Sequence, residues 1–264
     1  MWSMYKLSSD WKTDLEILKL TGSEIIQNID YLIIRTPTNP NYHWGNFLMV
    51  LDPNSVDSAT RWIGTFQNEF PYANWTSIGL PCMPRKIDAW ESNGINLEQL
   101  EIMTTQQLPI FSTLSDEYTS RIISGDDWEL LINKEIQENL DSGQFDHLVH
   151  EKFVRDTNRS RKSLCDAGKA AWFGVFHDDS LVANLGIVAC DNIGRYQSVE
   201  TNQAHRRKGL ASHLIRIAAD WAREKSCNEF VIITESTNNA GLLYKKVGFR
   251  SQLGGVSAYK EPLN

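Results

Sequence analysis

A basic glycine turn joins a strand-like segment to an amphipathic helix within residues 199–217. The turn reads Arg-Arg-Lys-Gly at 206–209, and Leu210, Leu214 and Ile217 then recur at helical spacing. The first amides of a helix have no hydrogen-bond partner inside it, and the helix dipole favours a negative charge there. Glycine lets the backbone approach a ligand closely. The segment therefore predicts a strand, a phosphate-binding turn and a helix in succession.

An ordinary helix start with solvated cations is the alternative interpretation of this turn. Basic side chains at a helix N-terminus oppose the dipole, so that interpretation leaves their position unexplained. The chain as a whole is acidic, with a net charge of −7 and a pI of about 5.4. An acidic chain argues against general binding to nucleic acid or to membrane surfaces. A local basic cluster within it indicates a small anionic ligand instead.

The four cysteines, Cys82, Cys165, Cys190 and Cys227, lie far apart in the sequence. They form no Cys-x-x-Cys pair and no Cys/His cluster at zinc spacing, so we expect free thiols and no bound metal. The first residues lack the apolar core of a signal peptide, and no apolar run reaches membrane-spanning length. These features predict a cytoplasmic protein.

The second part of the chain shows a regular alternation of strand and helix patterns. Two β-rich segments flank a turn at 177–180, which predicts a hairpin, and the short apolar run at 230–234 is typical of a buried strand. We expect strands at 117–124, 170–176, 181–190, 195–201 and 230–234 and from 249, with helices from 125, within 145–165, from 210 and within 236–248.

The first part of the chain repeats this order in shorter form. A helix opens at Asp10-Trp11, strands are expected at 31–36, 46–52 and 75–80, and a helix at 59–70. Trp90 precedes Gly94 at the spacing by which Tyr244 precedes Gly248. The pattern predicts a duplication, with domains at 1–112 and 113–264; chance similarity of two α+β segments is the alternative. The first copy has no basic turn, so we expect it to be catalytically inactive.

Three groups of residues resemble the motifs of the GNAT superfamily of acyl-CoA N-acyltransferases. Residues 206–211 fit that family's Arg/Gln-x-x-Gly-x-Gly/Ala loop, and the preceding Val199-x-Thr201 fits the family pattern as well. The later series Asn238, Tyr244 and Gly248-Phe249 fits as well. The first part resembles the degenerate N-terminal repeat of tandem GNAT proteins.

The resemblance implies an α/β (α+β) fold of tandem GNAT-like domains, each a mixed, mostly antiparallel sheet flanked by helices. It also implies that acetyl-CoA or coenzyme A lies between two splayed strands as a co-substrate. Main-chain groups of Val199 and Thr201 would hold the pantetheine arm. The implied cofactor-binding set is Val199, Thr201, Arg206, Arg207, Lys208, Gly209, Leu210, Ala211, Ser212 and Asn238.

Two residues are candidates for the chemistry of acyl transfer to an amine. Tyr244 fits the position of a proton donor to the leaving thiolate, although full transfer between unperturbed groups is uphill by about 2 kcal/mol. Packing alone is its alternative role. Glu200 points away from Val199 and Thr201 by strand alternation, and it is either a base acting through water, a ligand of the substrate ammonium or an ordinary strand residue.

The sequence therefore predicts an N-acetyltransferase that transfers acetyl from acetyl-CoA to a primary amine of a small molecule or peptide by direct attack. A coenzyme-A-binding regulatory or scaffold protein without turnover is the alternative. A nucleotide-binding domain is disfavoured because no Gly-x-x-x-x-Gly-Lys-Ser/Thr motif is present. The acceptor amine, the acyl length and the general base stay open. We expect no nucleic-acid or membrane partner, and a monomer or weak homodimer.

Overall fold

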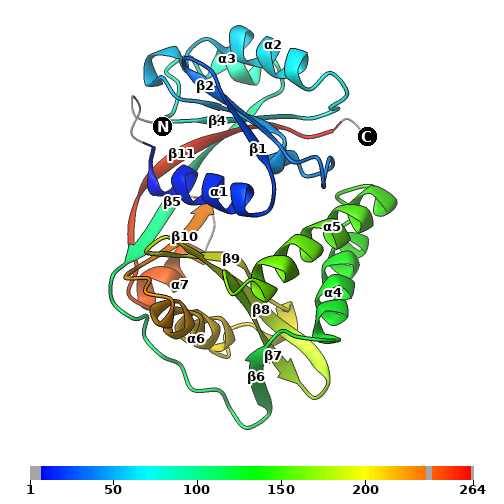
Figure 1. Cartoon of the computed structure of the whole chain (residues 1–264), viewed down its shortest axis with the longest axis vertical. Coiled ribbons are helices and arrows are strands. Elements are labelled where there is room, and N and C mark those ends of the chain that lie inside the picture. The colour runs from blue at the N-terminus through cyan, green and yellow to red at the C-terminus, as the bar shows by residue number, and fades with distance from the viewer. Residues whose placement is uncertain (1–6, 236–239, 263–264) are drawn as a thin grey trace. The chain divides into compact units, whose positions relative to one another are not determined.

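The computed structural model describes residues 7–235 and 240–262, and the contacts divide them into two compact units (Figure 1). The described part of the first unit consists of 7–102, 233–235 and 252–262, and that of the second consists of 103–232 and 240–251. The units are thus not successive halves of the chain. The duplication into 1–112 and 113–264 remains a prediction about ancestry, because compact units built from separate segments do not test it.

The second unit is built on a sheet of successive antiparallel strands. Strands β6, β7, β8 and β9 pair in chain order, and β9 then pairs in parallel with β10. Their bounds are β6 Tyr118–Ile122, β7 Ala170–His177, β8 Ser180–Cys190, β9 Ile193–Thr201 and β10 Glu229–Glu235. The helices are α4 Asp127–Ser142, α5 His147–Asp166, α6 Leu210–Glu224 and α7 Ala240–Lys246. All these elements match the expected segments.

Side-chain alternation along β8 separates the two faces of this sheet. Leu185 and Ile187 point into the core that α6 fills with a buried apolar stripe. Gly186 lies on the other face, against Trp172 of β7, and Trp172 in turn contacts Trp128 of α4. Helices α4 and α5 therefore cover one face and α6 the other (Figure 1).

The first unit has a similar sheet made from different segments. Strands β1, β2 and β3 pair antiparallel, β3 pairs in parallel with β4, and β4 pairs antiparallel with the last strand of the chain, β11. The elements are α1 Ser9–Leu20, β1 Glu24–Gln27, β2 Tyr31–Arg35, β3 Phe47–Val50, α2 Ala59–Glu69, β4 Thr76–Leu80, α3 Asp88–Glu91, β5 Asn96–Thr105 and β11 Arg250–Lys260. Strands β1 and β5 were not expected, because both mix polar and apolar residues without a clear period of two.

Burial alternates along the strands of the first unit as well. Leu32 and Ile34 pack with Trp11 of α1, whereas Ile33 packs with Trp62 of α2. The sheet thus carries α1 on one face and α2 on the other. Trp90 is fully buried and donates its indole N–H to the carbonyl of Val56 at 3.1 Å, so its polar atom is used in the core. Both units confirm the expected fold class, a mixed, mostly antiparallel sheet flanked by helices.

We expect Gly186→Ala to destabilise the second unit by about 1–3 kcal/mol, the usual cost of overpacking. A methyl group at this position would lie 2.3 Å from the Trp172 ring, which packs between Gly186 of β8 and Trp128 of α4. Urea unfolding monitored by tryptophan fluorescence measures the change. Gly64→Ala is the matched control, because its added methyl meets no atom within 4 Å. Equal stability of both variants would contradict the tight packing described for this face.

Candidate active site

A bulge bends β9 close to its C-terminal end. Asn184 of β8 pairs with Glu200, but Gly186 pairs with Gln197, so β9 carries one residue more than its partner across this interval. Ser198 takes up the extra length with a φ of +48°, in the left-handed region. The bulge redirects the last residues of β9, which include the predicted ligand-binding residues.

The parallel strands β9 and β10 stay paired for a short distance only. Their register runs from Ile193 opposite Glu229 to Arg195 opposite Val231. Within the described residues, β9 has no further partner on that side up to Thr201. Arg206 donates to the carbonyl of Thr201 at 3.1 Å. The strand edge between these points is the place where an extended ligand can add to the sheet.

The basic turn leads directly into a helix, as its sequence predicts. Arg207 has a φ of +62° and Gly209 a φ of +81°, and α6 begins directly after them at Leu210. The first hydrogen bond of the helix runs from His213 N to Gly209 O at 3.0 Å. The amides of residues 210–212 therefore have no acceptor within the helix and are available for an anion.

The cations of the turn differ in how they are held. Lys208 donates to the hydroxyl of Tyr118 at 2.7 Å, and that bond, with help from Glu117 at 3.9 Å, raises the pKa of Lys208. His205 contacts the same hydroxyl at 2.9 Å, as a loop contact. Arg207 is exposed and has no ion-pair partner among the described residues. The turn thus presents Arg207 to solvent and anchors its remaining cations to the fold.

Tyr244 lies on α7, in the core on the α6 face of the sheet. Its side chain is 5% exposed, and none of the described residues hydrogen-bonds its hydroxyl. Burial raises the pKa of Tyr244 to about 12, against a smaller opposing effect of Arg195. The tyrosine therefore stays protonated at neutral pH and is a hydrogen-bond donor.

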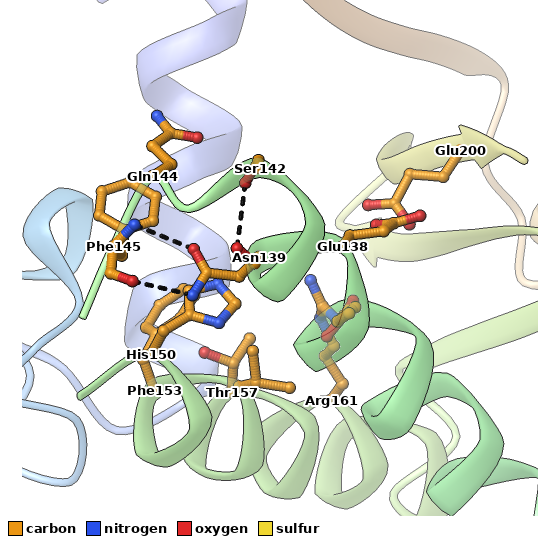
Figure 2. Close-up of a pocket in the computed structure, with 12 residues that line it drawn as sticks. Glu138, Asn139, Ser142, Gln144, Phe145, His150, Phe153, Thr157, Arg161 and Glu200 are labelled. Carbon is orange, nitrogen blue, oxygen red and sulfur yellow. Dashed lines mark hydrogen bonds and ion pairs between the residues drawn. The ribbon is translucent and has the colours of Figure 1, made fainter. Parts of the chain in front are cut away.

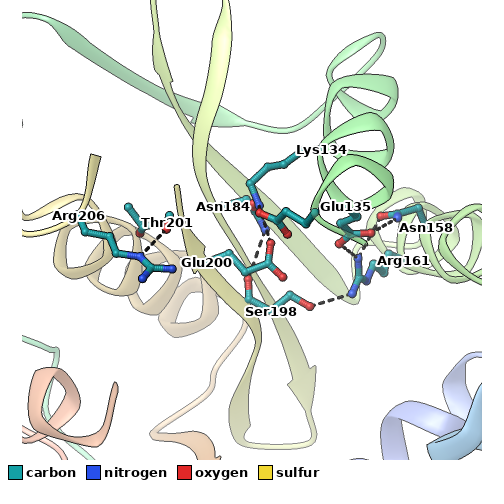
Figure 3. Close-up of polar contacts among 10 residues, drawn as sticks. Lys134, Glu135, Asn158, Arg161, Asn184, Ser198, Glu200, Thr201 and Arg206 are labelled. Atoms are coloured by element: carbon teal, nitrogen blue, oxygen red, sulfur yellow. Dashed lines mark hydrogen bonds and ion pairs between the residues drawn. The ribbon is translucent and has the colours of Figure 1, made fainter. Parts of the chain in front are cut away.

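Glu200 points to the opposite face, as strand alternation predicts, and binds Lys134 of α4 (Figure 3). The Lys134 ammonium lies 2.7 Å from Glu200 and 2.7 Å from Glu138. Burial raises the pKa of Glu200, Lys134 lowers it, and the neighbouring Glu135 and Glu138 raise it further. For Lys134, burial acts against the charge, but Glu200 and Glu138 outweigh it and the pKa is raised. One ammonium thus serves two carboxylates.

Arg161 ties α5 to α4 and to the bulge of β9 (Figure 3). Its guanidinium binds Glu135 at 2.6 Å and donates to the Ser198 hydroxyl at 2.8 Å. It also lies over the Trp172 ring, 5.2 Å from the centroid. Asn158 donates to the second oxygen of Glu135 at 2.7 Å. These contacts fix the bulge relative to both helices.

Asn184 lies beside Glu200 and is fully buried. Its amide nitrogen donates to the carbonyl of Ser198 at 3.3 Å, and its Oδ1 has no hydrogen-bond partner among the described residues. A buried acceptor without a donor is costly in a core and is common at binding sites. Asn184 is therefore a candidate site residue that the sequence patterns did not indicate.

A pocket of about 260 Å³ opens between α4 and α5 and extends to Glu200 (Figure 2). Three carboxylates line it, those of Glu135, Glu138 and Glu200, together with Arg161. The aromatic rings of Phe145, His150 and Phe153 line the part that lies away from Glu200.

Asn139 shapes the wall of this pocket. Its side chain forms two hydrogen bonds of 3.0 Å with the backbone of Phe145. Its backbone carbonyl accepts a hydrogen bond from Gly143 N at 2.7 Å. Gly143 has a φ of +64° and ends α4. The connection between α4 and α5 is thereby held against the pocket. Burial lowers the pKa of His150, so this ring is uncharged at neutral pH.

The structure brings the predicted loop residues together but separates the two predicted catalytic residues. Residues 199–212 form one continuous strand–turn–helix segment, whereas Tyr244 and Glu200 lie on opposite faces of the sheet. Asn238 lies outside the described residues. Lys134, Arg161 and Asn184 were missed; the Lys134–Glu138 spacing of one helical turn was the available signal for the first of them.

No group of three or more His, Cys, Asp or Glu side chains within 7–235 and 240–262 is arranged to hold a metal ion. No helix in the same part of the chain has both the length and the apolar character needed to cross a bilayer. The four cysteines are free, as expected.

We expect Lys134→Met to destabilise the protein by about 1–3 kcal/mol at neutral pH, because it leaves Glu138 and Glu200 facing each other without a cation. The pKa of Glu200 then rises further, so the folded protein binds a proton that the unfolded chain releases. The loss of stability therefore grows between about pH 5 and about pH 7. Urea unfolding at both pH values measures it.

Lys162→Met is the matched control, because it removes the lysine of an exposed pair with Asp166 at the same one-turn spacing. We expect the control to change stability by less than about 0.5 kcal/mol at either pH. A Lys134→Met effect that does not depend on pH would show that Lys134 acts by packing and not through the two carboxylates.

Comparison with known proteins adds family evidence to this geometry. Residues 136–249 match the model of the acetyltransferase (GNAT) family. Streptothricin acetyltransferase from Escherichia coli is 28% identical over 109 residues, which make up 40% of this chain and 58% of that protein. The match thus spans less than two thirds of the length of that relative.

Two solved structures share the fold. The GCN5-related N-acetyltransferase from Kribbella flavida has a TM-score of 0.65 at 12% identity and covers 98% of each chain. A tandem GNAT protein from the clavulanic acid biosynthesis pathway has a TM-score of 0.50 at 11% identity and also covers 98% of each chain. The family match and the shared fold agree with the strand–turn–helix segment, and residues 136–249 are similar to the acetyltransferase domains of the GNAT family.

Proposed function

We propose that this protein is an N-acyltransferase that moves an acetyl group from acetyl-CoA to a primary amine by direct attack. The observation that carries the proposal is the end of β9, where a free strand edge runs into a basic turn and the unpaired amides of α6. The free backbone groups of a strand edge can form hydrogen bonds with the amides of a pantetheine arm. The free amides and cations of the turn can bind a pyrophosphate. The family of residues 136–249 supports the same assignment.

The residues that would hold the donor lie along this segment. Backbone groups of Val199 and Thr201 would pair with the pantetheine arm, and the amides of 207–212 with the pyrophosphate, with Arg206, Arg207 and Lys208 supplying positive charge. Coenzyme A supplies an activated thioester when its acetyl form is bound. The geometry fits this ligand because Arg207 and Gly209 both have positive φ values, which turn the loop toward the first amides of α6.

Tyr244 is the proposed hydrogen-bond donor to the departing sulfur. The pKa of the Tyr244 hydroxyl, about 12, is far above the pKa of a thiol. Full transfer of its proton to a thiolate is therefore uphill by about 5 kcal/mol. We infer that it stabilises the developing negative charge by a hydrogen bond and does not become ionised.

Glu200 is the proposed acceptor of the amine proton. An alkyl ammonium must lose a proton before it attacks, and the raised pKa of Glu200 makes its carboxylate a stronger base than an exposed glutamate. Glu200 lies at one end of the pocket, where the amine of an acceptor would have to reach it (Figure 2). The streptothricin acetyltransferase of Escherichia coli, by its name, acetylates streptothricin, which supports acyl transfer to a small acceptor here.

The first unit is proposed to bind no acyl-CoA. Asp57 accepts the amides of Arg85 and Lys86, at 2.7 and 3.1 Å, close to the start of its helix α2. That acidic anchor replaces the basic turn, and Trp90 replaces the tyrosine with an indole bonded in the core. We therefore expect each chain to have one binding site for acyl-CoA.

We expect coenzyme A to stabilise the second unit. A ligand at a hundredfold excess over its Kd adds about 2.7 kcal/mol. That raises the melting temperature of a unit of this size by about 5 to 10 °C. Differential scanning fluorimetry measures the shift. Gly209→Glu should abolish it, because the variant strains a φ of +81° and puts a carboxylate at the phosphate site.

Gly168→Glu is the matched control, since Gly168 also has a positive φ, of +67°, and is exposed on another turn. Its shift with coenzyme A should equal that of the unchanged protein. Calorimetric titration should give one site per chain. An undiminished shift in Gly209→Glu, or two sites, would overturn the assignment of the turn or of the first unit.

We expect the protein to release free thiol from acetyl-CoA in the presence of a primary amine, and Tyr244→Phe to lower kcat by about a hundredfold. Binding of acetyl-CoA should change little, because the hydroxyl acts on charge that develops only during the reaction. Thiol release and mass spectrometry of the amide product measure this. The basic limb of the pH–rate profile should be the same in both proteins below about pH 11, since the tyrosine titrates above that range.

Tyr118→Phe provides a separate check on tyrosine substitution, because Tyr118 belongs to the anchor of the basic turn. It should weaken acetyl-CoA binding more than it changes turnover at saturation. Binding of coenzyme A without thiol release for any amine would favour the alternative, a regulatory protein that binds coenzyme A. Unchanged turnover in Tyr244→Phe, with chemistry rate-limiting, would show that Tyr244 only packs.

A further inference from the structure

Asn184 and Glu200 lie directly opposite each other at the end of the β8–β9 ladder. They form an antiparallel pair, so their side chains point to the same face of the sheet. Directly opposite residues have Cβ atoms about 4.5–5.5 Å apart, a distance that an asparagine and a glutamate side chain can span together. Figure 3 shows both residues beside Lys134 at the bulge. The Asn184 amide is therefore within reach of the Glu200 carboxyl group.

The bulge fixes the orientation of the Asn184 amide. Ser198 lies between the pairs Asn184–Glu200 and Gly186–Gln197 and belongs to neither. Its carbonyl can only accept, and it accepts from Nδ2 of Asn184 at 3.3 Å. The reversed amide would bring two acceptors together. Oδ1 therefore points away from the Ser198 carbonyl, and it has no donor among the residues that the structure describes.

Holding the bulge explains the amide nitrogen of Asn184 but not its oxygen. The residue is fully buried, and a buried acceptor without a donor costs stability. Across the pair, one oxygen of Glu200 accepts from Lys134, and no side chain within 7–235 and 240–262 donates to the other. Two neighbouring acceptors that both lack a donor are complementary to a single added proton.

The charges around Glu200 balance when this carboxyl group is neutral. Helix α4 contributes Lys134, Glu135 and Glu138 to its surroundings, and α5 contributes Arg161 to the same pocket. With Glu200 ionised, three carboxylates meet two cations. With Glu200 protonated, Lys134 pairs with Glu138, and Arg161 pairs with Glu135. The protonated state thus leaves no carboxylate of this group without a cation.

We propose that Asn184 is a positioning residue for the base: its Oδ1 accepts the O–H of Glu200 once that carboxylate has taken the amine proton. The proposal rests on the proposed function, in which Glu200 is this base. A hydrogen bond that only the neutral carboxyl group can donate favours the neutral form, and so it makes Glu200 a stronger base. Burial and the neighbouring carboxylates raise the pKa of Glu200 in the same direction.

The bond to Asn184 forms as the proton moves. One N–H bond of the acceptor ammonium breaks, and an O–H bond forms on Glu200. The electron pair left on the nitrogen attacks the thioester carbonyl, and the C–S pair leaves with the sulfur. A second proton of the nitrogen ends on the sulfur, which gives the amide and a free thiol, and Glu200 then releases its proton to solvent. Asn184 stabilises the protonated Glu200 and makes no bond to the substrate.

The unchanged protein tests the bond without any variant of Asn184. With the side-chain carbonyl carbons isotopically labelled, NMR should show Cγ of Asn184 changing its chemical shift over the same pH interval as Cδ of Glu200. In Glu200→Gln the glutamine amide can donate at every pH, so the Asn184 signal should stay at its low-pH position. An Asn184 signal that does not follow Glu200 would overturn the proposal.

Asn184→Leu removes the acceptor and keeps the branched shape of the side chain. We expect the titration of Glu200, and with it the acidic limb of the pH–rate profile for kcat/KM, to move to lower pH by about half a unit to one unit. The value of kcat should fall by about two- to tenfold. KM for the amine should change little, because the lost bond forms only as the proton moves.

Ser198→Ala is the matched control for damage to the bulge, because it removes the bond from Arg161 and leaves Asn184 in place. It should lower the midpoint of urea unfolding without moving the Glu200 titration or the acidic limb. An equal movement of the limb in both variants would show that Asn184 acts by holding the bulge, and the proposal would fall.

The NMR titration and the turnover assay can fail separately. Coupled titration of Asn184 and Glu200 in a protein that acylates no amine would uphold the hydrogen bond and overturn the acyltransferase. Turnover with an unmoved limb and an unmoved Glu200 titration in Asn184→Leu would uphold the acyltransferase and overturn the role of Asn184.

Discussion

The separation of β9 from β10 is the constraint on which the rest of the candidate site depends. In a pair of parallel strands, the backbone donors and acceptors that face the partner are used in the ladder. Here the ladder stops at Arg195 and Val231, and the bulge at Ser198 turns the last residues of β9 away from their earlier register. The strand edge, the basic turn and the start of α6 thereby form one continuous candidate binding surface. Without that break, residues 196–201 would be ordinary interior strand.

Charged contacts hold this irregular strand end in place. Arg161 links the bulge to Glu135, and Lys134 links Glu200 to Glu138. A bulge sacrifices ladder hydrogen bonds, and side-chain bonds from two helices compensate for that loss. Burial, together with the neighbouring carboxylates of Glu135 and Glu138, raises the pKa of Glu200 even though Lys134 lowers it. One set of residues thus supports the fold and sets the electrostatics of the pocket between α4 and α5.

The two units show how similar sheets carry different chemistry. Each has a parallel pair of strands in an otherwise antiparallel sheet, with helices on both faces. In the second unit the turn after β9 is basic and leads into a free helix terminus. In the first unit, the Asp57 carboxylate accepts hydrogen bonds from the amides of residues 85 and 86, and the indole N–H of Trp90 donates to a backbone carbonyl in the core. Local polar groups that bond to the protein itself are unavailable to a ligand.

The sequence alone determined the order of nearly all strands and helices and the position of the basic turn, because periodicity and glycine chemistry act over a few residues. The sequence also determined the face of the sheet toward which the Glu200 side chain points, since alternation within a strand is local. The pairing of β11 with β4, the bulge at Ser198 and the sharing of Lys134 between two carboxylates arose only in the tertiary structure. These features join residues that are distant in the chain, and their energies depend on packing and burial that no short segment contains.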